Sequence, residues 1–146
     1  MERLRNKSIE NYKATELLIS SKTYSVAVHC AYYSSFQLAM YYVLSYSVNE
    51  NEFDSFINKV KNGKGSHNEY INKLVNEVRG VDKYAGIDLY KAFNSFKSKR
   101  KDADYEMIEI DEDDAKKSFD FATELNNFLN NFFKNGKITE FSKKIF

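Results

Sequence analysis

The chain has 146 residues, which is enough for one domain and leaves hardly any room for a second. The 22 Lys and Arg residues balance 21 Asp and Glu residues, so the formal net charge of +1 excludes a molecule that is basic or acidic throughout, and any basic site must be local. The lack of proline, with only five glycines, argues against a sandwich or barrel with many tight turns and favours a few long helices.

Hydrophobic spacing near 3.6 residues predicts helices along most of the chain. The expected segments are, in order, 7–21, 24–46, 53–60, 66–79, 82–101 and 111–134. Segment 24–46 is apolar or aromatic on most of its circumference, so we expect it at the centre of a bundle. The sequence therefore predicts an all-α fold, an up-and-down bundle of four to five helices over 1–136, followed by an amphipathic C-terminal tail at 137–146.

Capping patterns mark several of the expected helix ends. Thr23 is a plausible N-cap, and Ser66 with Glu69 three residues later has the spacing of a capping box. The clearest start is Asp111, which is followed by three more acidic residues in the first turn. The pair Asn135 and Gly136 predicts the end of the last long helix.

The sequence shows no sign of export or of a membrane span. Cys30 is the only cysteine, so no internal disulfide can form, and the N-terminus lacks the apolar stretch of a signal peptide. The most apolar segment is interrupted by His29, Gln37 and several hydroxyl side chains, so it is expected to be a buried helix. We expect a cytoplasmic protein that does not enter a membrane.

Few residues have the chemistry of a metal site or a catalytic nucleophile. His29 and His67 are the only histidines, and no His-x-x-x-His or Cys-x-x-Cys spacing occurs, so we expect no metal and no cofactor. Neighbours in sequence point about 100° apart on a helix, so His29 and Cys30 do not form a base–nucleophile pair, and His29 is interpreted as structural. His67 follows a glycine-rich loop and is expected to be exposed.

One charged cluster stands above the background. Lys97, Lys99, Arg100 and Lys101 place four cations in five positions, and Tyr105 follows them. Such a local positive field suits phosphates, and a tyrosine ring suits stacking on a base or ribose. The alternative interpretation is a solvated helix end whose cations complement the helix dipole.

Two segments suggest a family. Tyr-Tyr-Ser-Ser-Phe-Gln-Leu-Ala at 32–39 and Lys-Arg-Lys-Asp-Ala-Asp-Tyr at 99–105 resemble the HEPN superfamily, and the resemblance covers about residues 7–134. It implies a bundle of four or five helices, usually a homodimer with the arginine segments lining a shared cleft. Many members are metal-independent ribonucleases or toxins of toxin–antitoxin pairs with a small nucleotidyltransferase partner, and others are non-catalytic RNA- or nucleotide-binding modules.

The ribonuclease members carry Arg-x(4–6)-His, and no arginine of this chain is followed by histidine at that spacing. We therefore predict a non-catalytic domain that binds RNA or a nucleotide through Lys97, Lys99, Arg100, Lys101 and Tyr105. Whether the chain is an enzyme stays open. Two alternatives remain, a weak endoribonuclease using Arg100 with Asp104, Tyr105 or His67, and a structural module whose aromatic helices pack against a partner protein.

Overall fold

The computed structural model describes residues 1–63 and 65–141, and within them the fold is a bundle of helices without a strand. The elements are α1 (Glu2–Ser20), α2 (Tyr24–Tyr42), the π-helical turn η1 (Val43–Ser47), α3 (Phe53–Asn62), α4 (Ser66–Arg79), α5 (Lys83–Tyr105) and α6 (Glu112–Lys134). The prediction of an all-α bundle is confirmed. Residues 1–63 and 65–141 contain six α-helices, one for each predicted helical segment, so the count exceeds the four to five expected for the bundle.

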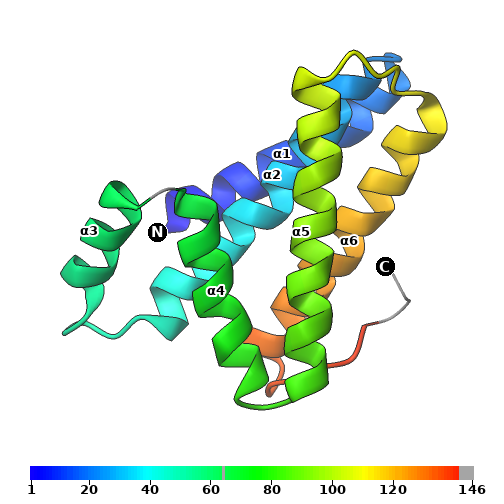
Figure 1. The fold of residues 1–146 in the computed structure, drawn as a ribbon. Coiled ribbons are helices and arrows are strands. Elements are labelled where there is room, and N and C mark those ends of the chain that lie inside the picture. The colour runs from blue at the N-terminus through cyan, green and yellow to red at the C-terminus, as the bar shows by residue number, and fades with distance from the viewer. Residues whose placement is uncertain (64, 142–146) are drawn as a thin grey trace.

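Helix α2 forms the centre of the bundle and packs against α1, α4, α5 and α6 (Figure 1). More than half of its residues are buried, including the rings of Tyr32 and Tyr42. The largest enclosed side chains of the neighbouring helices pack around it, among them Phe93 and Phe96 of α5 and Phe128 of α6. The central position predicted from the apolar circumference is therefore confirmed.

The second predicted helix ends earlier than expected. After Tyr42 the chain widens into η1, whose last bond runs from the amide of Val48 to the carbonyl of Val43 at 3.0 Å. Helix α3 then projects to one side of the bundle and packs against α4 (Figure 1). No residue of α3 is buried, although Phe56 and Ile57 pack against the core cluster.

One predicted capping pattern was confirmed and another was wrong. Asp111 caps α6 and forms a capping box with Asp114, as the acidic run led us to expect. The box predicted for α4 was wrong, because Ser66 is already helical and Gly65 occupies the N-cap without a side-chain bond. The Glu69 carboxylate instead pairs with Lys59 of α3 at 3.4 Å, so a contact between helices replaces the local one.

The predicted tail begins against the bundle. The Phe141 ring stacks on Phe128 at 4.2 Å, and the Lys137 ammonium donates to Glu77 at 3.3 Å. Residues 137–141 thus cover the end of the core next to α6, and the rest of the predicted tail, 142–146, lies outside the described residues.

Candidate functional site

The site is at the C-terminal end of α5, where this helix meets α2 and the start of α4. Lys97, Arg100, Lys101 and Asp104 recur at helical spacings of three and four, so they share one side of α5. The helix continues to Tyr105, one turn further than the predicted end at 101, and its last turn contains no basic residue. The dipole interpretation of the cation cluster is therefore wrong, because none of the cations lies in the last turn of α5, where the helix dipole acts.

Arg100 is the most buried of these cations, with only 5 % of its surface exposed. Its Nη1 donates to Oδ2 of Asp104 at 3.3 Å, one turn along the same helix. The guanidinium carbon lies 5.5 Å from the Tyr32 ring centre and 5.7 Å from that of Tyr33. Arg100 Nε is buried and makes no hydrogen bond. The arginine is thus fixed in place by a carboxylate and two aromatic rings, with one donor unused.

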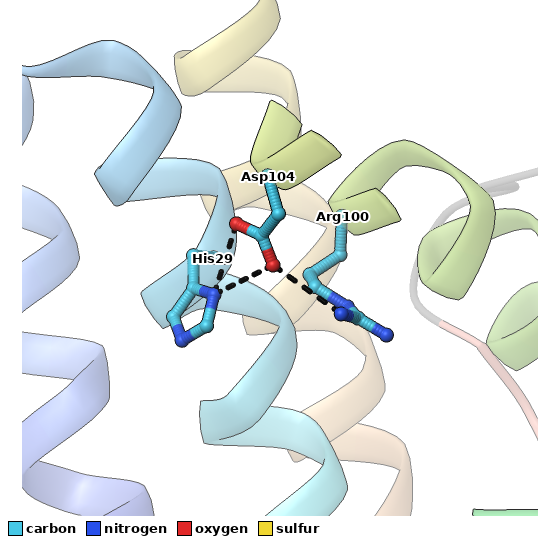
Figure 2. A network of polar contacts seen from close by, with 3 residues as sticks. All are labelled: His29, Arg100 and Asp104. Atoms are coloured by element: carbon cyan, nitrogen blue, oxygen red, sulfur yellow. Dashed lines mark hydrogen bonds and ion pairs between the residues drawn. The ribbon is translucent and has the colours of Figure 1, made fainter. Parts of the chain in front are cut away.

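Asp104 also holds a histidine from a different helix. His29 Nδ1 lies 3.0 Å from Oδ1 and 2.9 Å from Oδ2 of Asp104, so one carboxylate joins α2 to α5 (Figure 2). Because a carboxylate only accepts hydrogen bonds, Nδ1 carries the proton and Nε2 is the basic nitrogen of the neutral ring. The side chain of His29 is 43 % exposed, whereas that of Asp104 is 16 % exposed. His29 is therefore oriented by Asp104 while part of its ring faces solvent.

His67, at the start of α4, completes the aromatic wall of the site. Its ring centre lies 4.1 Å from that of Phe36, and it also contacts Tyr32 and Tyr33. Burial lowers the pKa of His67 to about 4, and the positive charges of Lys97, Arg100 and Lys101 act in the same direction. The prediction of an exposed His67 was wrong, since the ring is half-buried and neutral at pH 7.

The remaining predicted residues lie at different places around α5. Lys101 and Tyr105 are exposed, and the Tyr105 ring centre is 5.9 Å from the Arg100 guanidinium carbon. Lys97 is half-buried, and its pKa is lowered by this burial and by the nearby charges of Lys101 and Arg100. Lys99 lies on another side of the helix, where its ammonium stands 5.4 Å from the Phe121 ring of α6.

Sequence reasoning missed the partnership of His29 with Asp104, which are 75 residues apart. It also assigned no role in the site to Tyr32 and Tyr33. One signal was available, because His29, Tyr32 and Tyr33 stand at i, i+3 and i+4 and therefore share a face of α2. Cys30, the neighbour of His29, has its thiol pKa raised by burial and by Asp104, which lowers its reactivity.

The structure offers no metal-binding cluster at this site. Among residues 1–63 and 65–141, no group of three or more His, Cys, Asp or Glu side chains is placed to hold a metal ion. In the same ranges, no helix is both long and apolar enough to span a bilayer. The arrangement instead offers fixed positive charge, aromatic faces and one oriented histidine, which are suited to an anionic ligand carrying a flat ring.

Comparison with known proteins adds no family to this description. No protein-family model, no curated protein and no solved structure matches the chain. The resemblance to the HEPN superfamily remains a prediction from the segments at 32–39 and 99–105, and the function must be argued from the site itself.

Proposed function

We propose that this protein is a non-catalytic helical domain that binds RNA or a nucleotide through its phosphates at Lys97, Arg100 and Lys101. Tyr105, which is 75 % exposed, supplies a face on which a base or ribose stacks. The observation that carries the proposal is the grouping of three cations on one side of α5, one of them buried and pre-oriented.

The electrostatics of the cluster favour an anion. Arg100 has one carboxylate partner, Asp104, which it shares with His29. Lys97 and Lys101 make no hydrogen bond or ion pair within the described residues. Burial, together with repulsion from the nearby charges of Lys101 and Arg100, lowers the pKa of Lys97. A bound phosphate relieves this repulsion and meets donors that are already in position.

The test compares lysines on two sides of α5: Lys97 and Lys101 belong to the proposed site, whereas Lys99 lies on another side. We expect the double variant Lys97→Gln, Lys101→Gln to bind a labelled single-stranded RNA at least about tenfold more weakly than the wild type. Its slope of log affinity against log salt should be smaller by about 1.4. Lys99→Gln is the control, because this lysine lies against Phe121 on α6. Equal affinities of wild type and double variant at low salt would contradict the proposal.

A second candidate, a metal-independent endoribonuclease, is favoured by the contact between His29 and Asp104. In this reaction His29 Nε2 removes the proton of a ribose 2′-hydroxyl, whose oxygen attacks the adjacent phosphorus. The bond to the 5′-oxygen breaks, water protonates this leaving group, and a 2′,3′-cyclic phosphate forms. Asp104 orients the base, and Arg100 stabilises the charge on the phosphate oxygens.

The roles assigned to the other residues change in this second candidate. Asp104 positions His29 instead of taking the proton, and His67, with its pKa of about 4, is a poor acid at pH 7. RNA cleavage in the presence of a chelator tests it. We expect His29→Gln to abolish cleavage while RNA binding persists. We expect His67→Gln to retain cleavage. Cleavage that survives in His29→Gln would exclude this mechanism.

The predicted partners belong to the proposal as well. The resemblance implies a homodimer and a nucleotidyltransferase partner, and light scattering of the purified chain tests the homodimer directly.

The third alternative, a structural interaction module, needs a continuous exposed aromatic patch. The exposed aromatic residues that the structure describes are Tyr46 in η1 and Tyr84, Tyr90 and Tyr105 along α5. Their spread over η1 and the full length of α5 does not favour that alternative.

A further inference from the structure

A large cleft lies between α3, α4 and α5 and has a volume of about 840 Å³. Its α5 wall contains Ile87, Tyr90 and Lys91, its α4 wall includes Arg79, and Phe56 of α3 stands opposite. Small-molecule and cofactor sites have similar volumes and a similar mixture of apolar walls with a few polar groups. The cleft is therefore large enough to hold one or two nucleotides of a longer ligand.

The charge left unpaired in this cleft is positive. Its two carboxylates are both engaged, Glu69 with Lys59 at 3.4 Å and Glu52 with Lys73 at 3.3 Å. Arg79 and Lys91 make no hydrogen bond and no ion pair within residues 1–63 and 65–141. Two cations are thus available to phosphates while the acidic groups nearby are neutralised.

The position of Arg79 is fixed by a glycine. A Cβ added to Gly86 would lie 2.0 Å from Arg79 Cγ, so the arginine stem crosses the bare backbone of α5 where the two helices meet. A side chain at position 86 would push this stem away. The close approach keeps Arg79 at the cleft without a partner carboxylate.

The cleft and the cation cluster are joined along one side of α5. Tyr90, Asn94, Lys97 and Lys101 recur at spacings of four, three and four residues, which return to the same side of a helix. From Tyr90 to Lys101 this stripe measures about 16 Å. Tyr90 is 47 % exposed, Asn94 and Lys101 are exposed, and none of the four is acidic.

We infer that this stripe and the cleft continue the interface of the proposed function, and that the ligand is single-stranded RNA of about five or more nucleotides rather than a mononucleotide. The inference rests on the proposed function. A stacked strand advances about 3.4 Å per nucleotide, so about five nucleotides span the stripe. Tyr105 and Tyr90 then stack bases near its two ends, and Arg79 and Lys91 contact phosphates beyond Tyr90.

The experiment measures binding of fluorescein-labelled oligouridines of 2, 4, 8 and 12 nucleotides to the full chain by fluorescence anisotropy. We expect the affinity to rise at least about tenfold from 2 to 8 nucleotides and then to level off. The variant Arg79→Gln, Lys91→Gln should weaken binding of the 8-mer about tenfold and reduce its salt slope by about 1.4, with no effect on the 2-mer. Tyr90→Ala should weaken the 8-mer by about fivefold or more.

The control is Lys116→Gln, Lys117→Gln, which removes two positive charges from exposed positions on α6. Thermal unfolding of each variant shows whether the fold is intact, and Tyr90→Ala tests the same cleft without a change of charge. If the wild type binds neither the 2-mer nor the 12-mer, the proposed function fails. If it binds the 2-mer and the 12-mer equally, and the cleft variants bind as the wild type does, this inference fails and the proposed function stands.

Discussion

Two charged clusters lie within fifteen residues of each other, one at the end of α5 and one at the start of α6, and they are built differently. In α6 the Asp111 side chain accepts from the Asp114 amide at 2.8 Å, and the Asp114 side chain accepts from the Asp111 amide at 3.1 Å. The next lysines pair with acids one turn earlier, Lys117 with Asp113 at 2.8 Å. All these contacts stay within one helix and on the surface.

The α5 cluster depends on other helices. Arg100 is buried against tyrosine rings of α2, Asp104 binds His29 of α2, and His67 of α4 faces the cations. Local helix chemistry accounts for the acidic cluster and leaves no charge in need of a ligand. It does not account for a buried arginine with an unused donor, and burial of a charge is unfavourable unless it is paired. The α5 cluster, rather than the α6 cluster, therefore fits the anion site of the proposed function.

The largest effect expected from this difference is on stability when the buried arginine is removed. Arg100→Ala leaves Asp104 without its cation and opens a space beside Tyr32 and Tyr33, so we expect the free energy of unfolding to fall by about 2 to 4 kcal/mol. Urea unfolding of the wild type and the variant measures it. Arg100→Lys is the matched variant, and it should recover part of the loss because it keeps the charge but lacks the planar fork. A loss below about 1 kcal/mol would show that Arg100 contributes no more to stability than an exposed ion pair does.

The second effect is a dependence of stability on pH between about 6.5 and 4, which arises at His67 beside the α5 cluster. An unfolded histidine titrates near pH 6.5, whereas the pKa of His67 in the fold is about 4. Between these values the unfolded chain binds a proton that the folded chain does not, so stability is full above pH 6.5 and falls as the pH drops towards 4. Allowing for the partial exposure of the ring, we expect this histidine to contribute about 1 to 2 kcal/mol to that fall.

Urea unfolding at pH 7.5 and at pH 4.5 measures the fall in wild type and in His67→Gln, which has no titrating group at this position. All other ionisable groups are the same in the two proteins, so their contribution cancels in the comparison. We expect the wild type to lose more stability than the variant between the two pH values. An equal loss would show that His67 is not desolvated among the rings of α2.

The same contrast explains what could be predicted from sequence. The prediction that Asp111 caps α6 was correct, because an N-cap side chain bonds to an amide only three positions away. The prediction that the second helix lies at the centre of the bundle was correct, because burial follows the apolar pattern. The capping box at Ser66 was wrong because the helix begins one residue earlier, with Gly65 as N-cap, and Glu69 pairs with Lys59 on another helix. The contact of His29 with Asp104 was missed because the two residues become neighbours only after folding. Local rules determine helices and their ends, whereas a site assembled from three helices requires the tertiary arrangement.

A third, smaller effect tests whether the acidic cluster is a cap and nothing more. Asp111→Ala removes the acceptor of the Asp114 amide, and we expect the melting temperature to fall by about 3 °C. Asp111→Asn should melt close to the wild type, because asparagine caps a helix about as well as aspartate. RNA binding should be the same in both. Weaker binding by Asp111→Ala alone would indicate that the start of α6 supports the site on α5.

The smallest effect is expected for the exposed pair on α6, and it sets the scale for the other three. Lys117→Ala breaks a 2.8 Å ion pair with Asp113 that is shorter than the 3.3 Å contact between Arg100 and Asp104. Yet both partners of the α6 pair are mostly solvated, so we expect the melting temperature to change by less than about 1 °C. A scanning calorimetry comparison of Lys117→Ala with Arg100→Ala decides whether burial or distance governs the strength of these pairs. A larger change for Lys117→Ala would overturn the argument from burial, because distance alone would then rank the two contacts.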